Sequence, residues 1–221
     1  GACAEAGVPM LILDRPNPLG GVVLEGPIAR DTGSPVCAAA IPIRHGMTLG
    51  ELAVHFWQTA FSRSKLSLQV NPADNWPREL MHHACGLPWA PPSPNMPSAA
   101  TALVYVGTCL FEGTNLNEGR GTDTPFLLLG APWLDAAAVA DAVAEPARAG
   151  CRLEPARYVP RSIPGKAASP RYLGESCGGV RITVEAPETV RGFSLALALL
   201  SAVRRTHPDR FAFTPFFDTL A

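Results

Sequence analysis

Polar side chains able to do chemistry gather in residues 112–133, where Glu112, Glu118 and Arg120 are interspersed with amides, hydroxyls and glycines. Within this stretch the polar residues run directly into an apolar segment, residues 126–129. Glycine lets a backbone approach a ligand closely, and a polar loop fixed by a buried strand often carries function. We therefore predict a binding or catalytic loop here, although turn formation explains any single one of these residues equally well.

Sugar hydrolysis is the chemistry that this set of groups fits best. It commonly needs two carboxyl groups, one to protonate the leaving oxygen and one to act as base or nucleophile. Glu112 and Glu118 form the best pair, with Asp14 and Glu25 as more distant candidates. A close pair of carboxylates would favour a glycosidase, whereas amides and aromatic rings without such a pair would favour a non-catalytic sugar-binding module. The retaining and inverting mechanisms both stay open.

Several other classes of protein are disfavoured. The sequence has no G-x-G-x-x-G after its first apolar run, no Walker loop, no H-E-x-x-H and no G-x-S-x-G. Lys and Arg total 18 against 19 Asp and Glu, which gives no electrostatic footprint for nucleic acid or an anionic membrane. No apolar run approaches the roughly 20 residues of a membrane-spanning helix. The six cysteines contain no C-x-x-C pair, so we expect mostly buried thiols, no metal and no cofactor.

The apolar run at residues 8–13 predicts a buried strand in a parallel sheet. A second group of polar residues follows this run. Asp14, Arg15 and Asn17 come directly after it. Ligands of open α/β sheets bind at the carboxyl ends of strands, so these three residues are site candidates. A proline-stiffened turn with a surface Asp–Arg pair is the alternative.

Arg44 and His45 precede the best helix start in the chain. Thr48 followed by Glu51 predicts a capping box, and an apolar stripe continues for about four turns. Residues 71–97 are rich in proline and tryptophan, and these rings suit either sugar stacking or packing.

The remaining elements alternate between helices and short strands, which predicts an α/β fold with an α+β C-terminal lobe. Ser98 should cap a helix that delivers Glu112 into the central loop, and Asp135 should cap an alanine-rich helix. The expected helices are residues 99–111, 135–149 and 189–206, the expected strands are 66–70, 126–129, 151–159 and 180–184, and residues 28–40 are expected to be a loop. The aromatic tail at residues 211–217 should pack back onto the core.

Several motifs in one order resemble a known family. They are LDRPNP (13–18), EGP (25–27), PIRHGMT (42–48), GEL (50–52), PSPN (92–95), EGTN (112–115), GRGT (119–122), PF (125–126) and GAPW (130–133). Weaker matches to the same family extend to CGGV (177–180) and FD (217–218). The sequence is similar to the DUF1343 proteins, exo-β-N-acetylmuramidases of the NamZ type.

This resemblance implies a hydrolase that removes non-reducing-end N-acetylmuramic acid from peptidoglycan fragments, acting in the periplasm or outside the cell. It implies a Rossmann-like N-terminal lobe, of which residues 1–27 would be the end and carry the last strand, and a C-terminal lobe of residues 28–221. The family's Glu-His-Gly motif, with its proposed catalytic glutamate, does not occur here. The N-terminal lobe is therefore an expected partner of this chain. Whether the chain is active without that lobe is left open.

The motif loops supply the candidate site. Glu112 and Glu118 are the catalytic candidates, and the substrate-binding candidates are Asp14, Arg15, Asn17, Arg44, His45, Asn95, Asn115, Arg120 and Thr122. We expect Asp14 and the central loop to converge on one cleft. We also expect Arg15, Arg44 or Arg120 to bind the lactyl carboxylate of muramic acid, since arginine binds carboxylates in bidentate fashion.

Overall fold

A computed structural model describes residues 1–28 and 38–220, with side chains up to residue 218. The chain divides into two compact units, Gly1–Pro88 and Trp89–Ala221. The lobe boundary expected after Pro27 falls inside the first unit and stays a prediction about the family's lobes. Cys37 and most of the loop expected at residues 28–40 lie outside the described residues.

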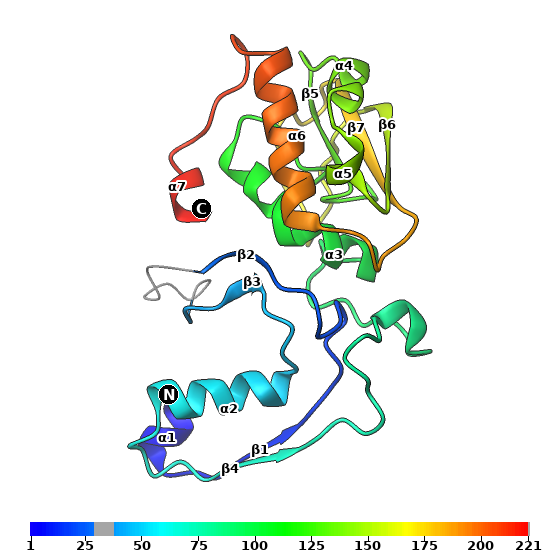
Figure 1. Ribbon diagram of the computed structural model, residues 1–221. Helices are drawn as coiled ribbons and strands as arrows, with labels where there is room; N and C mark the ends of the chain where they lie inside the picture. The colour runs from blue at the N-terminus through cyan, green and yellow to red at the C-terminus, as the bar shows by residue number, and fades with distance from the viewer. Residues whose placement is uncertain (29–37, 221) are drawn as a thin grey trace. The chain divides into compact units, whose positions relative to one another are not determined.

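The first unit contains a parallel strand pair with one helix packed on it (Figure 1). β1 (Met10–Leu13) pairs with β4 (Leu68–Asn71), and α2 (Leu49–Ala60) contacts both strands. The parallel strand and the capping box at Thr48 are both confirmed. The prediction that β1 is buried is wrong, because Leu11 and Leu13 are 59% and 66% exposed. With two strands and one helix, this layer leaves part of its apolar surface uncovered.

Four further elements of the first unit were not predicted. β2 (Glu25–Ile28) and β3 (Pro42–Arg44) form an antiparallel pair. Both strands are short, and neither shows the alternation of apolar and polar residues that identifies a strand in a sequence. The other elements are α1 (Ala2–Ala6) and the 3₁₀ turn η1 (His82–Ala84).

The second unit is built on a three-stranded antiparallel sheet in the order β5-β7-β6. The strands are β5 (Leu128–Ala131), β6 (Cys151–Tyr158) and β7 (Cys177–Val184). β5 begins two residues later than expected because Phe126 has a φ of 63°, in the left-handed region, and its N–H bonds to the carbonyl of Glu118. That turn holds the central loop against the start of β5.

Two helices pack closely against each other in this unit, α3 (Ala99–Thr108) and α6 (Gly192–Thr206) (Figure 1). A Cβ atom on Gly107 would lie 2.4 Å from the carbonyl oxygen of Gly192, so this approach requires glycine. Ser98 caps α3 as predicted. The last predicted turns of α3 are instead the 3₁₀ helix η2 (Cys109–Gly113), which carries Glu112.

The predicted alanine-rich helix is broken into α4 (Ala136–Asp141) and α5 (Glu145–Arg148). Pro146 lies in the first turn of α5, where proline is tolerated, but it cannot lie inside a continuous helix. Asp135 caps α4 as predicted, accepting a hydrogen bond from the backbone of Ala138 at 3.1 Å.

The aromatic tail packs back onto the second unit, as predicted. Phe213 forms a β-bridge with Thr114, and α7 (Phe217–Leu220) contacts η2. Together with the parallel and antiparallel sheets, this arrangement confirms the α/β class.

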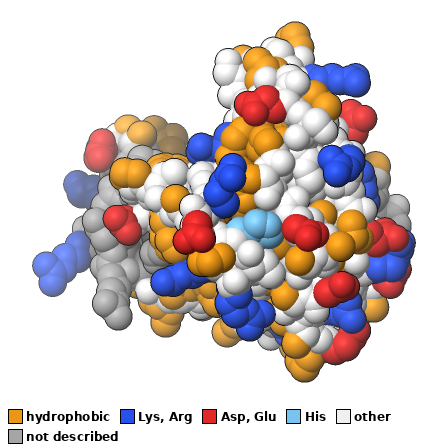
Figure 2. Space-filling view, turned by 90° about the horizontal axis from the view of Figure 1, so that it is seen from above, with side chains coloured by type: hydrophobic (Ala, Val, Ile, Leu, Met, Phe, Trp, Pro, Cys, Tyr) orange, Lys and Arg blue, Asp and Glu red, His pale blue; other side chains and the backbone are white. Residues whose placement is uncertain are grey.

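The surface is mixed in charge. On the face shown in Figure 2, basic and acidic side chains are interspersed rather than gathered by sign. Of the described helices, none has the length and apolar composition needed to cross a membrane. Cys3, Cys85, Cys109, Cys151 and Cys177 are free thiols.

Candidate functional site

Arg120 lies between the two glutamates that were predicted as catalytic candidates. Its Nε donates to Glu112 Oε1 at 3.1 Å and lies 3.0 Å from Glu118 Oε1, while Nη2 also bonds to Glu112. Because both oxygens lie beside the same nitrogen, they are no further apart than about 6 Å. The central loop therefore holds two carboxylates close together, the arrangement expected of a glycosidase.

Aromatic side chains pack against the arginine that joins this pair. The guanidinium of Arg120 lies 5.1 Å from the ring centroid of Phe126, and the Tyr105 ring packs edge-to-face on the same ring at 4.7 Å. The side chain of Glu118 is 10% exposed. Burial raises the pKa of Glu118, and the attraction of Arg120 does not fully offset this. Glu118 therefore keeps its proton to a higher pH than an ordinary glutamate, as a general acid requires.

Asn117 organises the loop and was not predicted as a site residue. It is fully buried; its backbone bridges to Gly130, and its Nδ2 donates to the carbonyls of Arg120 and Arg171. Its Oδ1 accepts bonds from the Gly119 N–H and the Tyr158 hydroxyl at 2.9 and 3.1 Å. An asparagine amid glycines and charged residues is a weak signal in a sequence, because its contacts with Gly130, Arg171 and Tyr158 depend on the tertiary fold.

The other candidates of this unit bond to the protein itself. Asn95 is buried and donates to the carbonyl of Lys166 at 2.8 Å. Thr122 donates to the Gly119 carbonyl at 2.7 Å. Asn115 binds the tail from both ends of its amide, with Nδ2 donating to the Arg210 carbonyl at 2.7 Å and Oδ1 accepting from the Ala212 N–H at 3.0 Å. Their predicted roles in substrate binding stay predictions, beside these positioning roles.

Replacing Asn115 by Ala should loosen the tail. The N–H of Ala212 would lose its acceptor, and one hydrogen bond of about 1 kcal/mol corresponds to roughly fivefold faster exchange through local opening. Amide hydrogen exchange at Ala212 measures this. Thr122→Ala is the matched control, because the Thr122 hydroxyl donates within its own loop. Unchanged exchange in Asn115→Ala would mean that the Asn115 side chain does not hold the tail.

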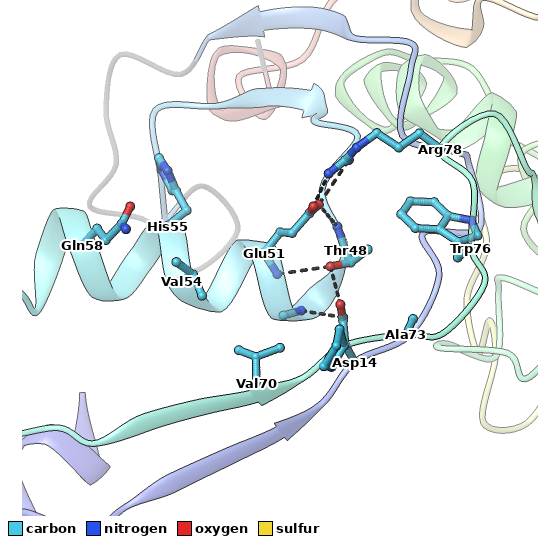
Figure 3. A pocket seen from close by; sticks show the side chains of 12 residues that line it. Asp14, Thr48, Glu51, Val54, His55, Gln58, Val70, Ala73, Trp76 and Arg78 are labelled. Carbon is cyan, nitrogen blue, oxygen red and sulfur yellow. Dashed lines mark hydrogen bonds and ion pairs between the residues drawn. The ribbon is translucent and has the colours of Figure 1, made fainter.

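In the first unit, Asp14 binds the N-terminus of α2. Its Oδ1 accepts from the Gly50 N–H at 2.7 Å and its Oδ2 from the Thr48 hydroxyl at 2.7 Å (Figure 3). A Cβ atom on Gly50 would lie 2.8 Å from the Asp14 Cγ, so glycine permits this approach. Burial raises the pKa of Asp14, but the bonds from Gly50, Thr48 and the Arg15 N–H outweigh it, and the net shift is downward.

The neighbouring candidates divide between buried and exposed positions. Arg44 is 2% exposed and forms an ion pair with Glu25 at 2.8 Å. Asn17 donates to the Met47 carbonyl at 2.9 Å, and His45 Nδ1 accepts from the Met47 N–H at 3.1 Å. Burial lowers the pKa of His45. Arg15 is exposed, which leaves its side chain accessible to a ligand.

A cavity of about 460 Å³ lies beside Asp14 in the first unit (Figure 3). Its lining includes Glu51, Gln58, Trp76 and Arg78, none of which was in the predicted site. One signal in the sequence was available: residues 51, 55 and 58 share one helix face.

Replacing Asp14 by Asn should destabilise the first unit at neutral pH by about 1 kcal/mol, the usual value for a lost helix cap. Because the folded-state pKa of Asp14 is lowered, its contribution is present above the unfolded-state pKa and is lost as the pH falls through the folded-state value. Urea unfolding at pH 7 and at pH 3 should therefore differ less in the variant than in the wild type. Asp74→Asn, at an exposed position, is the control and should change neither value. A pH dependence preserved in Asp14→Asn would contradict this role.

Asp14 and the Glu112–Arg120–Glu118 group belong to different units. Their convergence on one cleft stays a prediction.

Comparison with known proteins covers nearly every residue of the chain. Residues 1–100 match the family model "Exo-beta-N-acetylmuramidase NamZ, N-terminal" and residues 103–221 match "Exo-beta-N-acetylmuramidase NamZ, C-terminal". The peptidoglycan β-N-acetylmuramidase NamZ of Bacillus subtilis (strain 168) is 35% identical over 223 residues, which cover 100% of this chain and 52% of the relative.

Two crystal structures of DUF1343 family proteins from Bacteroides fragilis NCTC 9343 are also similar. One has a TM-score of 0.84 at 26% identity, and the match covers 98% of this chain and 54% of the chain in that structure. The other has a TM-score of 0.74 at 36% identity, and the match covers 99% of this chain and 57% of the chain in that structure. The chain thus spans about half the length of these relatives. It belongs to the NamZ family of exo-β-N-acetylmuramidases, also known as DUF1343, as its motifs predicted.

Proposed function

We propose that the chain serves a glycoside hydrolase that removes non-reducing-end N-acetylmuramic acid from peptidoglycan fragments. The observation that carries this proposal is the similarity along its whole length to a peptidoglycan β-N-acetylmuramidase. The close carboxylate pair in the second unit supports it with suitable chemistry.

The two glutamates have different surroundings, and this difference assigns their roles. Glu118 is the more buried carboxyl group, and its raised pKa makes it the proton donor to the leaving oxygen. Glu112 accepts two hydrogen bonds from Arg120, which hold its carboxylate in place and suit it as the partner carboxylate.

A non-catalytic sugar-binding module is the second candidate. One observation favours it: Arg120 is already paired with both glutamates, so this group also fits a structural ion-pair cluster. In that case the chain would bind peptidoglycan sugars without cleaving them.

Release of N-acetylmuramic acid from a MurNAc–GlcNAc disaccharide tests the proposal. We expect robust release from a chimera in which this chain replaces the matching half of the Bacillus subtilis relative. We expect negligible release from the 221-residue chain alone, because the family resemblance implies a further catalytic glutamate in a Glu-His-Gly motif that these residues do not contain. A GlcNAc–GlcNAc disaccharide, which lacks the lactyl group, is the control substrate. Disaccharide binding by a correctly folded chimera without any release would favour the binding module.

A further inference from the structure

We propose that the cavity of the first unit is a subsite for an uncharged hexopyranose of the N-acetylglucosamine type. The choice of a sugar rests on the proposed function, while the preference for an uncharged one rests on the cavity itself. Its volume of about 460 Å³ is within the usual range of small-molecule sites.

The cavity has two walls of different character. α2 contributes Glu51, His55 and Gln58, which point from one face of the helix (Figure 3). The segment after β4 contributes Trp76 and Arg78. A lining that combines one indole with several polar side chains suits a ring that has apolar C–H faces and a hydroxyl rim.

The two walls are held in place by contacts within the unit. The Trp76 Nε1 donates to the Leu80 carbonyl at 3.0 Å, which fixes the indole. Glu51 is held by the Thr48 N–H at 3.0 Å and by Arg78, whose Nη1 lies 3.3 Å from Oε2. Gln58 is exposed and presents both an amide donor and an acceptor. The site is thus preorganised at one end and adaptable at the other.

Charge decides which sugar fits. Asp14 and Glu51 both line the cavity, and hydrogen bonds lower the pKa of each despite some burial, so both are ionised at neutral pH. Arg78 supplies the opposing charge and is already paired with Glu51. A ligand carboxylate would therefore meet an excess of negative charge, and repulsion would disfavour it. An uncharged sugar meets no such penalty.

NMR titration of the 221-residue chain with three sugars tests this subsite. The probes are N-acetylglucosamine, N-acetylmuramic acid and the methyl ester of N-acetylmuramic acid, which keeps the bulk of the lactyl group without its charge. We expect N-acetylglucosamine to shift the Trp76 indole and Gln58 amide resonances. N-acetylmuramic acid should bind about tenfold more weakly, and the ester should recover most of that loss.

Two variants and one control complete the test. Trp76→Ala should weaken N-acetylglucosamine binding about tenfold, and Gln58→Ala, at an exposed helix position, should weaken it without disturbing the fold. Trp89→Ala is the matched control, since the Trp89 indole also donates to a backbone carbonyl, that of Met96, but lies in the second unit. The subsite is rejected if N-acetylmuramic acid binds as tightly as N-acetylglucosamine, if no sugar shifts these resonances, or if Trp89→Ala weakens binding equally.

Failure of this inference and failure of the proposed function are distinguishable. Sugar binding in the cavity without release by the chimera would overturn the hydrolase and keep the subsite. Release by the chimera without sugar binding in the cavity would overturn the subsite and keep the hydrolase.

Discussion

Replacing Glu118 by Gln should reduce N-acetylmuramic acid release by the chimera about 10²- to 10⁴-fold, the usual contribution of a positioned general acid. Gln keeps the size of the side chain and still accepts a hydrogen bond from Arg120, so the loop should fold normally. The loss should therefore appear in kcat rather than in KM. Steady-state kinetics on the MurNAc–GlcNAc disaccharide measure both.

The pH profile separates proton donation from a structural role. Because burial raises the pKa of Glu118, wild-type activity should fall on the alkaline side as Glu118 loses its proton. Where residual activity is measurable, Glu118→Gln should lack this limb. Asp123→Asn is the control, an exposed carboxylate of the same loop, and should keep both rate and profile. Full activity in Glu118→Gln, or an equal loss in Asp123→Asn, would remove Glu118 from the proposed mechanism.

Replacing Arg44 by Ala should destabilise the first unit by about 3–5 kcal/mol, the usual loss when one partner of a buried ion pair is removed. The buried Glu25 side chain would lose the guanidinium that now lies 2.8 Å away. The bond from Arg44 Nη2 to the Leu19 carbonyl, at 2.6 Å, would also be lost. Chemical denaturation followed through tryptophan fluorescence measures the change in unfolding free energy.

Arg15→Ala is the matched control, since Arg15 is an exposed arginine of the same unit. Surface substitutions of this kind typically change stability by about 0.5 kcal/mol or less. The double variant Glu25→Gln/Arg44→Met should recover part of the loss, because it removes both buried charges. A small effect of Arg44→Ala would instead support the original interpretation of Arg44 as a ligand-binding residue.

Features set by neighbouring residues were predictable from the sequence. The Thr48–Glu51 capping box, the Ser98 and Asp135 caps and the parallel strand before Asp14 all occur in the structure. Each depends on contacts within one element or on the pattern of apolar residues along it. The family motifs could also be recognised from the sequence, because matching short strings of residues in a fixed order does not require knowledge of the fold.

The surroundings of each polar side chain were decided only by the tertiary structure. Arg44 and Glu25 are 19 residues apart, and Asn115 and Ala212 are 97 apart, yet each pair is bonded. A sequence shows that Glu118 is a carboxylate near Arg120, but not that it is buried, and burial is what raises its pKa. The sequence therefore determined which groups this protein brings to its chemistry, while long-range packing determined which carry charge, which hold the fold and which line a cavity.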